Sequence, residues 1–273
     1  MIASLKRNLR LYPWYVGLFH AYFWLPIYFL FFNSKLVLAD VLYLASIYFA
    51  SVVLMEVPSG WFSDTFGRKK TLVTASCFLC VAYVLFLFAN TFEQFAIAQI
   101  FLAGGIAFNS GTDTSFLLET TQALSDEDSY ATCEAKAMKF NFLGTAFASV
   151  LGGLAAIPDY RGAYILSLLG GIGLLVITLQ LQEPAQHKKD DQMNFFKQIG
   201  SCFSLLQEVK LLWLSAFTVL MIVINHIPYE FYQPYMEELA KQYDALTTTP
   251  LLTSVHLTLT MLIASWIASR SIR

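Results

Sequence analysis

Long apolar runs alternate with short polar connectors along the whole chain. Eight runs of roughly twenty mostly apolar residues are each long enough to cross a bilayer as a helix. They cover about residues 13–32, 41–62, 71–90, 95–118, 138–157, 163–182, 211–232 and 250–269. The pattern predicts an all-α polytopic membrane protein, a bundle with about eight transmembrane helices.

Lysine and arginine are divided unevenly between the two ends of these spans. Of the 17 basic residues, only Lys35, Arg161 and Lys241 fall on one side, which leaves 14 on the other. Basic residues concentrate in cytoplasmic segments, so both ends of the chain are predicted to lie in the cytoplasm. We expect a multi-pass protein of the cell (inner) membrane.

The composition supports lipid as the main surroundings of this chain. Hydrophobic residues make up 57% and charged residues only 13%, with a mean hydropathy of +0.57. Soluble domains carry about 25% charge. A net charge of −2 without a basic domain argues against a nucleic-acid partner. There is no phosphate-binding loop, zinc spacing or nucleophile elbow, so neither an enzyme nor a cofactor nor a metal is expected.

The longest connector, 183–210, follows the sixth span and predicts a division into two halves. Its apolar residues recur at spacings of three and four, which fits either a helix lying on the inner leaflet or a poorly ordered linker. The predicted parts are a six-helix half (1–182), the linker (183–210) and the start of a second half (211–273). The short matches SGWFSD (59–64) and ASWIAS (264–269) fall at corresponding places in the two halves.

One polar segment, EVPSGWFSDTFGRKKTL (56–72), interrupts the apolar pattern between the second and third spans. It resembles the signature G-x-x-x-D-(R/K)-x-G-R-(R/K)-x-x-L, which the major facilitator superfamily carries between helices two and three. The matching residues are Gly60, Asp64, Gly67, Arg68, Lys69 and Leu72, whereas Thr65 stands where a base is usual. The resemblance implies two six-helix halves around a central cavity. Only eight of twelve expected helices are present, so we expect a chain truncated after its eighth helix.

The resemblance also implies that this segment is a cytoplasmic gate. Asp64 and Arg68 are four residues apart and can pair, and Glu119 matches the carboxylate at the end of helix four that joins them in the family. Gly60 is expected to let a neighbouring helix approach closely, and Gly67 to allow a tight reversal. The alternative is that the basic run only determines topology.

A second segment, GTAFASVLGG (144–153), resembles the signature g-x-x-x-G-P-x-x-G-G of drug and proton antiporters. Gly144, Gly152 and Gly153 match, while Ala148 and Ser149 replace Gly-Pro. Gly144, Ala148 and Gly152 form a small-residue stripe that permits close helix packing, and packing alone explains the pattern equally well. Gln99 stands where the antiporters carry an arginine tied to proton coupling.

Polar side chains inside the predicted spans are candidate functional residues. A charge at a span's centre costs about 2.5–3.5 kcal/mol on insertion scales. The candidates for binding a proton or a solute are Asn109 and Asp113 in span four, His226 and Glu230 in span seven, and His20 and Trp24 in span one. Asp113 could instead be satisfied by neighbouring hydroxyls, and His226 and Glu230 by water.

Together these features predict a secondary active transporter that works by alternating access. Its expected activity is proton-linked efflux of drug-like or amphipathic molecules, with lipid, a small-molecule substrate and protons as partners. Two alternatives remain: a truncated, non-transporting membrane interaction protein, and a facilitator that imports a small polar solute.

Overall fold

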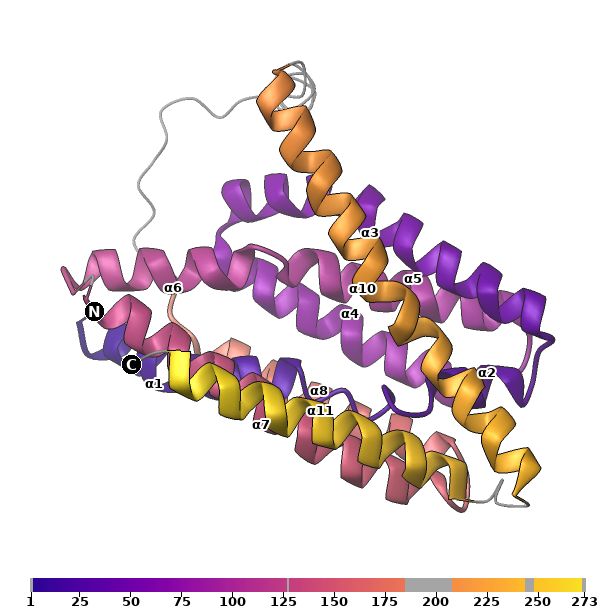
Figure 1. The fold of residues 1–273 in the computed structure, drawn as a ribbon. Helices are drawn as coiled ribbons and strands as arrows, with labels where there is room; N and C mark the ends of the chain where they lie inside the picture. The colour runs from indigo at the N-terminus through magenta and orange to yellow at the C-terminus, as the bar shows by residue number, and fades with distance from the viewer. Residues whose placement is uncertain (1, 127, 185–207, 244–247, 272–273) are drawn as a thin grey trace.

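The computed structural model describes residues 2–126, 128–184, 208–243 and 248–271, and these residues form helices without a strand (Figure 1). Most of the linker at 183–210, with its expected interfacial helix, lies outside the described residues. The helices are α1 (Ile2–Phe19), α2 (Tyr28–Asn33), α3 (Leu38–Phe66), α4 (Arg68–Phe88), α5 (Phe92–Asn109), α6 (Thr112–Ala123), α7 (Asp128–Ala156), α8 (Arg161–Gln180), α10 (Val209–Gln242) and α11 (Thr249–Ser271).

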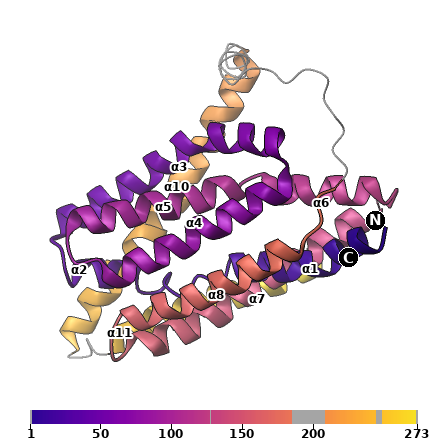
Figure 2. The same cartoon turned by 180° about the vertical axis from the view of Figure 1, so that it is seen from behind.

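The helices form two layers, which are seen from opposite sides in Figures 1 and 2. One layer contains α3, α4 and α5, with α5 packed against both of the others. The other contains α1, α7, α8 and α11, with α7 packed between α1 and α11. Contacts between α4 and α8 join the layers, and α10 crosses the bundle obliquely. Helix α11 therefore rests on the first half of the chain through α7.

Five of the eight predicted spans coincide with helical stretches that are long and apolar enough to cross a membrane. Among the described residues these are Leu38–Phe66, Arg68–Phe88, Phe92–Ala123, Arg161–Gln180 and Thr249–Ile267. The predicted spans at 138–157 and 211–232 are also helical, in α7 and α10. Helix α7 carries Lys139 and Asn141 at the start of its apolar run, and Val209–Met221 is the apolar stretch found among the described residues of α10. The count of eight stays a prediction.

The predicted first span, 13–32, is not a continuous helix. Helix α1 ends at Phe19, and a stretch of turns separates it from α2, which begins at Tyr28. Pro26 in this stretch lacks a backbone N–H and disfavours helical geometry at Leu25, which accounts for the irregular backbone directly before α2. The first span therefore consists of two helices with irregular backbone between them.

The predicted fourth span, 95–118, is likewise interrupted. Helix α5 ends at Asn109, and α6 begins at Thr112 and continues to Ala123. Gly111 between them has a φ of 67°, a left-handed conformation that glycine adopts without the steric cost of a Cβ. A hydropathy pattern does not register such a break because the apolar residues continue on both sides of it.

An aromatic cluster fixes one end of the bundle. Phe31 lies 5.4 Å from Phe95 and 5.1 Å from Tyr164 between ring centroids, and Phe86 lies 4.9 Å from Tyr164. All four side chains are at least 99% buried. Because they come from α2, α4, α5 and α8, they hold the short α2 against the rest of the bundle.

The exposed surface of helix α3 indicates what kind of environment surrounds the bundle. Only 11% of its most apolar window is buried inside the structure, and Val53 and Leu54 are 72% and 74% exposed. A long apolar helix with this much exposed apolar surface needs lipid or another apolar partner against it. The described helices therefore present the surface of a membrane-embedded bundle.

Candidate functional site

Arg68 is the centre of an ion-paired cluster where α3 meets α4. Its Nη1 lies 2.8 Å from Oδ1 of Asp64, and its Nε lies 2.9 Å from Oε1 of Glu119 in α6. The same Nη1 donates to Oγ of Ser63 at 2.8 Å. The structure thus brings together Asp64, Arg68 and Glu119, the three residues whose side chains were expected to pair. We call Ser63, Asp64, Arg68, Glu119 and Glu183 (described below) the gate cluster.

The connection between α3 and α4 is a single residue long. Nearly all of FSDTFGRKK (62–70) is helical, and Gly67 alone separates the two helices. Gly67 has a φ of 103°, which supports the predicted tight reversal. At Gly60 the expected close approach of a helix is not seen within the described residues, where no atom lies within 4 Å of the position its Cβ would occupy.

Glu183 completes the cluster and was not predicted. Its carboxylate accepts hydrogen bonds from the backbone N–H groups of Arg68 and Lys69, at 2.7 and 3.0 Å, and so caps the first turn of α4. Asn8 holds the segment in place by exchanging hydrogen bonds of 2.8 and 2.9 Å with the backbone of Gln182. The available signal was an acid directly after the end of the predicted sixth span, at Gln182.

Burial and hydrogen bonding have opposite effects on the pKa of the Glu183 carboxyl. Partial burial raises the pKa of its carboxyl above the ordinary glutamate value, and the nearby charge of Glu119 acts in the same direction. The N–H groups of Arg68 and Lys69 and the charge of Arg68 lower the pKa but do not cancel the rise. The α4 cap therefore takes up a proton at a higher pH than an exposed glutamate would.

The break between α5 and α6 gathers the polar residues predicted in span four. The amide Nδ2 of Asn109 donates to Oδ2 of Asp113 at 3.4 Å, and the hydroxyl of Tyr15 in α1 donates to Oδ1 of Asn109. The backbone N–H of Thr114, in the first turn of α6, donates to Oδ1 of Asp113 at 2.7 Å. A carboxylate at a helix N-terminus is electrostatically favoured, which accounts for an ionisable group at this depth.

Two further contacts connect this break with α3. The hydroxyl of Ser110 donates to Oε1 of Glu56 at 2.7 Å. The hydroxyl of Thr112 donates to Oγ of Ser63 at 3.2 Å, and Ser63 in turn receives the hydrogen bond from Arg68. Ser63 is 99% buried. It is therefore a direct link between the gate cluster and the residue next to Asp113.

The candidates from span one lie at the α1–α2 break. The Nδ1 of His20 is 2.9 Å from the carbonyl oxygen of Val16, and Thr145 of α7 donates to the carbonyl oxygen of His20 at 2.9 Å. Rings of His20, Tyr22 and Trp24 follow one another at centroid distances of 5.7 Å. The non-helical segment between α1 and α2 thus carries three neighbouring rings, each with an apolar face and a polar edge.

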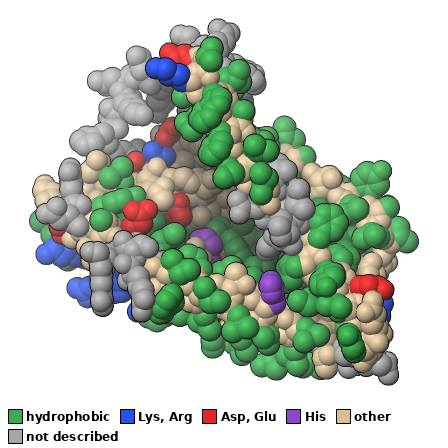
Figure 3. Space-filling view, viewed as in Figure 1, with side chains coloured by type: hydrophobic (Ala, Val, Ile, Leu, Met, Phe, Trp, Pro, Cys, Tyr) green, Lys and Arg blue, Asp and Glu red, His purple; other side chains and the backbone are tan. Residues whose placement is uncertain are grey.

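The candidates from span seven are only partly located. His226 and Glu230 belong to α10, but their side chains lie outside the described residues, so their expected pairing is not tested. Figure 3 shows a face of the molecule that is hollowed beside α10, with histidine and acidic side chains near the hollow.

The small-residue segment of α7 lies against two other helices. A Cβ at Gly144 would come within 2.5 Å of the carbonyl oxygen of Gly17 in α1, and one at Gly152 would collide with the carbonyl oxygen of Phe23. Gly153 faces Ser254 of α11 instead. The stripe therefore lets α7 pack closely against the interrupted first span, as its spacing predicted. Gly153 lets α11 approach α7 closely on another side.

These features define a polytopic helical membrane protein with interrupted helices and a charged junction at one end of the bundle. Residues 14–273 match the model of the Major Facilitator Superfamily, and the chain belongs to this family. A search of curated proteins finds no match. Membership makes the chain a multi-pass membrane protein from a family of secondary transporters of small solutes, not of enzymes.

Proposed function

We propose that this protein is a proton-linked exporter of amphipathic molecules in the inner membrane, with Asp113 as its proton site and the gate cluster on the cytoplasmic side. The observation that carries the proposal is the position of Asp113. It lies at the break in the fourth span, contacts Asn109, and is next to Thr112, which bonds to Ser63 of the gate cluster.

Protonation of Asp113 would change the contacts at this break. The ionised carboxylate accepts hydrogen bonds from Asn109 and from the N–H of Thr114, and a neutral acid accepts them more weakly. When the hydrogen bond from the N–H of Thr114 to Asp113 weakens, the first turn of α6 is less restrained, and Thr112 can move relative to Ser63. Because Ser63 also binds Arg68, the proton at Asp113 is coupled to the gate.

Two observations support an amphipathic substrate that leaves the cell. The rings of His20, Tyr22 and Trp24 offer apolar faces with polar edges, which suits a solute of mixed character. The small-residue segment of α7 resembles the antiporter signature and packs against both α1 and α11.

The test is proton-driven efflux by the full-length protein in proteoliposomes, using a fluorescent amphipathic cation. Asp113→Asn should abolish gradient-driven efflux but retain exchange of the solute across the membrane without a gradient. Ser63→Ala should lower the pH dependence of transport while leaving solute binding intact. Asp40→Asn, at the start of α3 and far from the break in sequence, is the matched control and should transport normally. Unchanged gradient-driven efflux in Asp113→Asn would remove Asp113 from the mechanism.

A facilitator for a small polar solute is the second candidate, and Gln99 favours it. This side chain is 93% buried in α5, and its Oε1 has no hydrogen-bond partner among the described residues. It stands where the antiporters carry their coupling arginine. Flux of a small polar solute that is indifferent to the proton gradient, in the parent and in Asp113→Asn alike, would identify this function.

A further inference from the structure

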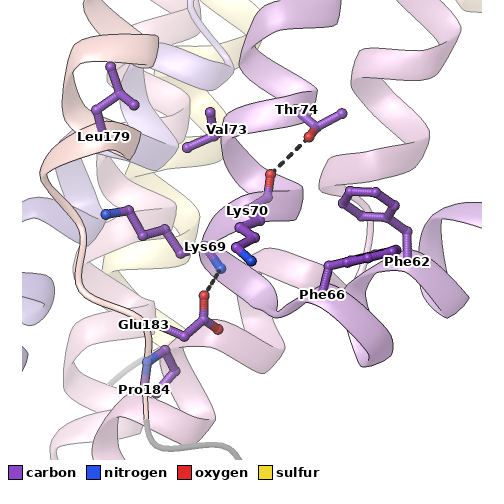
Figure 4. Close-up of a pocket in the computed structure, with 9 residues that line it drawn as sticks. All are labelled: Phe62, Phe66, Lys69, Lys70, Val73, Thr74, Leu179, Glu183 and Pro184. Atoms are coloured by element: carbon purple, nitrogen blue, oxygen red, sulfur yellow. Dashed lines mark hydrogen bonds between the residues drawn. The ribbon is translucent and has the colours of Figure 1, made fainter. Parts of the chain in front are cut away.

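A cavity of about 740 Å³ opens where α3 ends, α4 begins and α8 ends. Figure 4 shows its lining residues around one hollow. They are Phe62, Phe66, Lys69, Lys70, Val73, Thr74, Leu179, Glu183 and Pro184. The cavity lies beside the gate cluster and shares Glu183 with it, but it is separate from the helix break that carries Asp113.

The lining has two chemically different parts. Phe62, Phe66 and Leu179 provide an apolar wall, and the side chains of Phe66 and Leu179 are 45% and 56% exposed. Lys69 and Lys70 provide two ammonium groups, neither of which forms an ion pair within the described part of the chain. The carboxylate of Glu183 is occupied by the N–H groups of α4. The cavity therefore offers positive charge next to exposed apolar surface.

The position of the cavity relative to the membrane follows from its three helices. Leu38–Phe66, Arg68–Phe88 and Arg161–Gln180 are all candidate spans, and each begins or ends at this cavity. The ends of spanning helices lie where hydrocarbon gives way to headgroups. At that depth the surrounding molecule with both an anionic group and an apolar chain is a phospholipid.

We propose that this cavity binds one phospholipid with an acidic headgroup. Lys69 and Lys70 hold its phosphate, and Phe62, Phe66 and Leu179 line the first part of an acyl chain. Two ammonium groups against one carboxylate leave net positive charge, which selects an acidic over a zwitterionic headgroup. The bound lipid contacts both α4 and α8, the two elements that Glu183 joins. This inference depends on the membrane placement of the helices and not on the transported solute.

Binding is measured by native mass spectrometry of the purified full-length protein with phosphatidylglycerol and with phosphatidylcholine. The wild-type protein should retain phosphatidylglycerol preferentially. Lys69→Gln/Lys70→Gln should lower that retention about twenty-five-fold, since each lysine near an anionic surface contributes on the order of a fivefold effect. The double variant Lys136→Gln/Lys139→Gln removes two exposed lysines of α7 that do not line the cavity, and it should match the wild type.

Further measurements distinguish binding of the whole lipid from binding of its headgroup alone, and from loss of folded structure in the variants. Leu179→Ser should weaken retention, whereas Leu169→Ser, on the same helix and 60% exposed, should not. Soluble glycerol phosphate should fail to displace the lipid. The single variant Lys70→Gln, at an exposed side chain, should show an intermediate loss with an unchanged melting temperature. Equal retention of both lipids, equal losses in the two lysine pairs, or displacement by glycerol phosphate would overturn the proposal.

Discussion

Arg68 makes three side-chain contacts, and its partners differ in how far they are shielded from water. The Asp64 side chain is 46% exposed and that of Glu119 is 27% exposed. Exposed ion pairs contribute about 0–1 kcal/mol, and bonds to less exposed charges about 1.5–3 kcal/mol. The Glu119 contact should therefore contribute more to the stability of the junction between α3, α4 and α6 than the Asp64 contact.

We predict that Glu119→Gln lowers the free energy of unfolding by about 1–2 kcal/mol, and Asp64→Asn by less than about 1 kcal/mol. Arg68→Lys should cost at least as much as Glu119→Gln, because one ammonium cannot reproduce the planar fork that reaches Ser63, Asp64 and Glu119. Thermal melts of the purified protein in detergent provide the measurement. Lys70→Ala is the control and should melt normally in lipid-free detergent; equal losses for Glu119 and Asp64 would contradict the prediction.

Glu183 predicts a pH dependence of stability. Its folded-state pKa lies above the ordinary value of 4.5. The stability that the protonated form contributes is therefore complete below pH about 4.5 and is lost as the pH rises through the raised pKa. The difference in unfolding free energy between the wild type and Glu183→Gln should fall over this window and then level off. Melts from pH 4 to about 8 test this; a constant difference would show that the carboxyl is not perturbed.

Residue-level contacts could be predicted only where the partners are close in sequence or match a known signature. Asp64 and Arg68 are one helical turn apart, and Glu119 was found through the resemblance. Glu183 and Ser63 could not be found in this way. Glu183 lies 115 residues from Arg68, and their contact depends on the tertiary packing that places the end of α8 next to the start of α4. Ser63 is one of many serines, and only the fold places it between Arg68 and Thr112.

At the level of helices, hydropathy predicted where helices lie but not where they are interrupted. The breaks at His20–Ile27 and at Ser110–Gly111 occur inside apolar runs, so average hydropathy hardly changes across them. The local signals were Pro26 and Gly111, single residues that helices often tolerate in membranes. Interrupted helices expose backbone groups that need partners, and these two breaks hold most of the candidate polar residues.

Replacing glycine with alanine is predicted to have opposite effects on stability in α7 and in α3. Gly152 of α7 is in contact with the carbonyl of Phe23, whereas Gly60 of α3 has open space around it. Gly152→Ala should destabilise the protein, since either the α1–α2 break or α7 must shift. Gly60→Ala should be neutral or stabilise by up to about 1 kcal/mol, because alanine is the better helix former. Melting temperatures of both variants in detergent decide this; destabilisation by Gly60→Ala would mean that its surroundings are not open.

At the scale of the molecule, α10 and α11 contact the first half of the chain at different places. Helix α11 packs along α7, while the C-terminal part of α10 packs against α2. Gln233 is completely buried at the second contact, where its Nε2 donates to the carbonyl of Leu25 at 2.7 Å and its Oε1 accepts from the N–H of Phe29 at 3.1 Å. Glu237, one turn further, accepts from Asn33 at 3.2 Å. Gln233 thus satisfies backbone groups that the interrupted first span leaves open.

This contact should open and close during transport if the halves move against each other, since it lies at the opposite end of α3 from the gate cluster. Gln233→Leu keeps the volume but leaves a buried carbonyl and a buried N–H without partners, at a cost of about 1–3 kcal/mol each. We predict that it shifts the population towards states with α10 separated from α2. Cross-linking of cysteines placed at Asn33 and Glu237 measures this separation, and the yield should fall several-fold in Gln233→Leu. Gln242→Leu, at the end of α10 beyond this contact, is the control. An unchanged yield would show that α10 and α2 are held together by their apolar surfaces alone, and that Gln233 only fills the break.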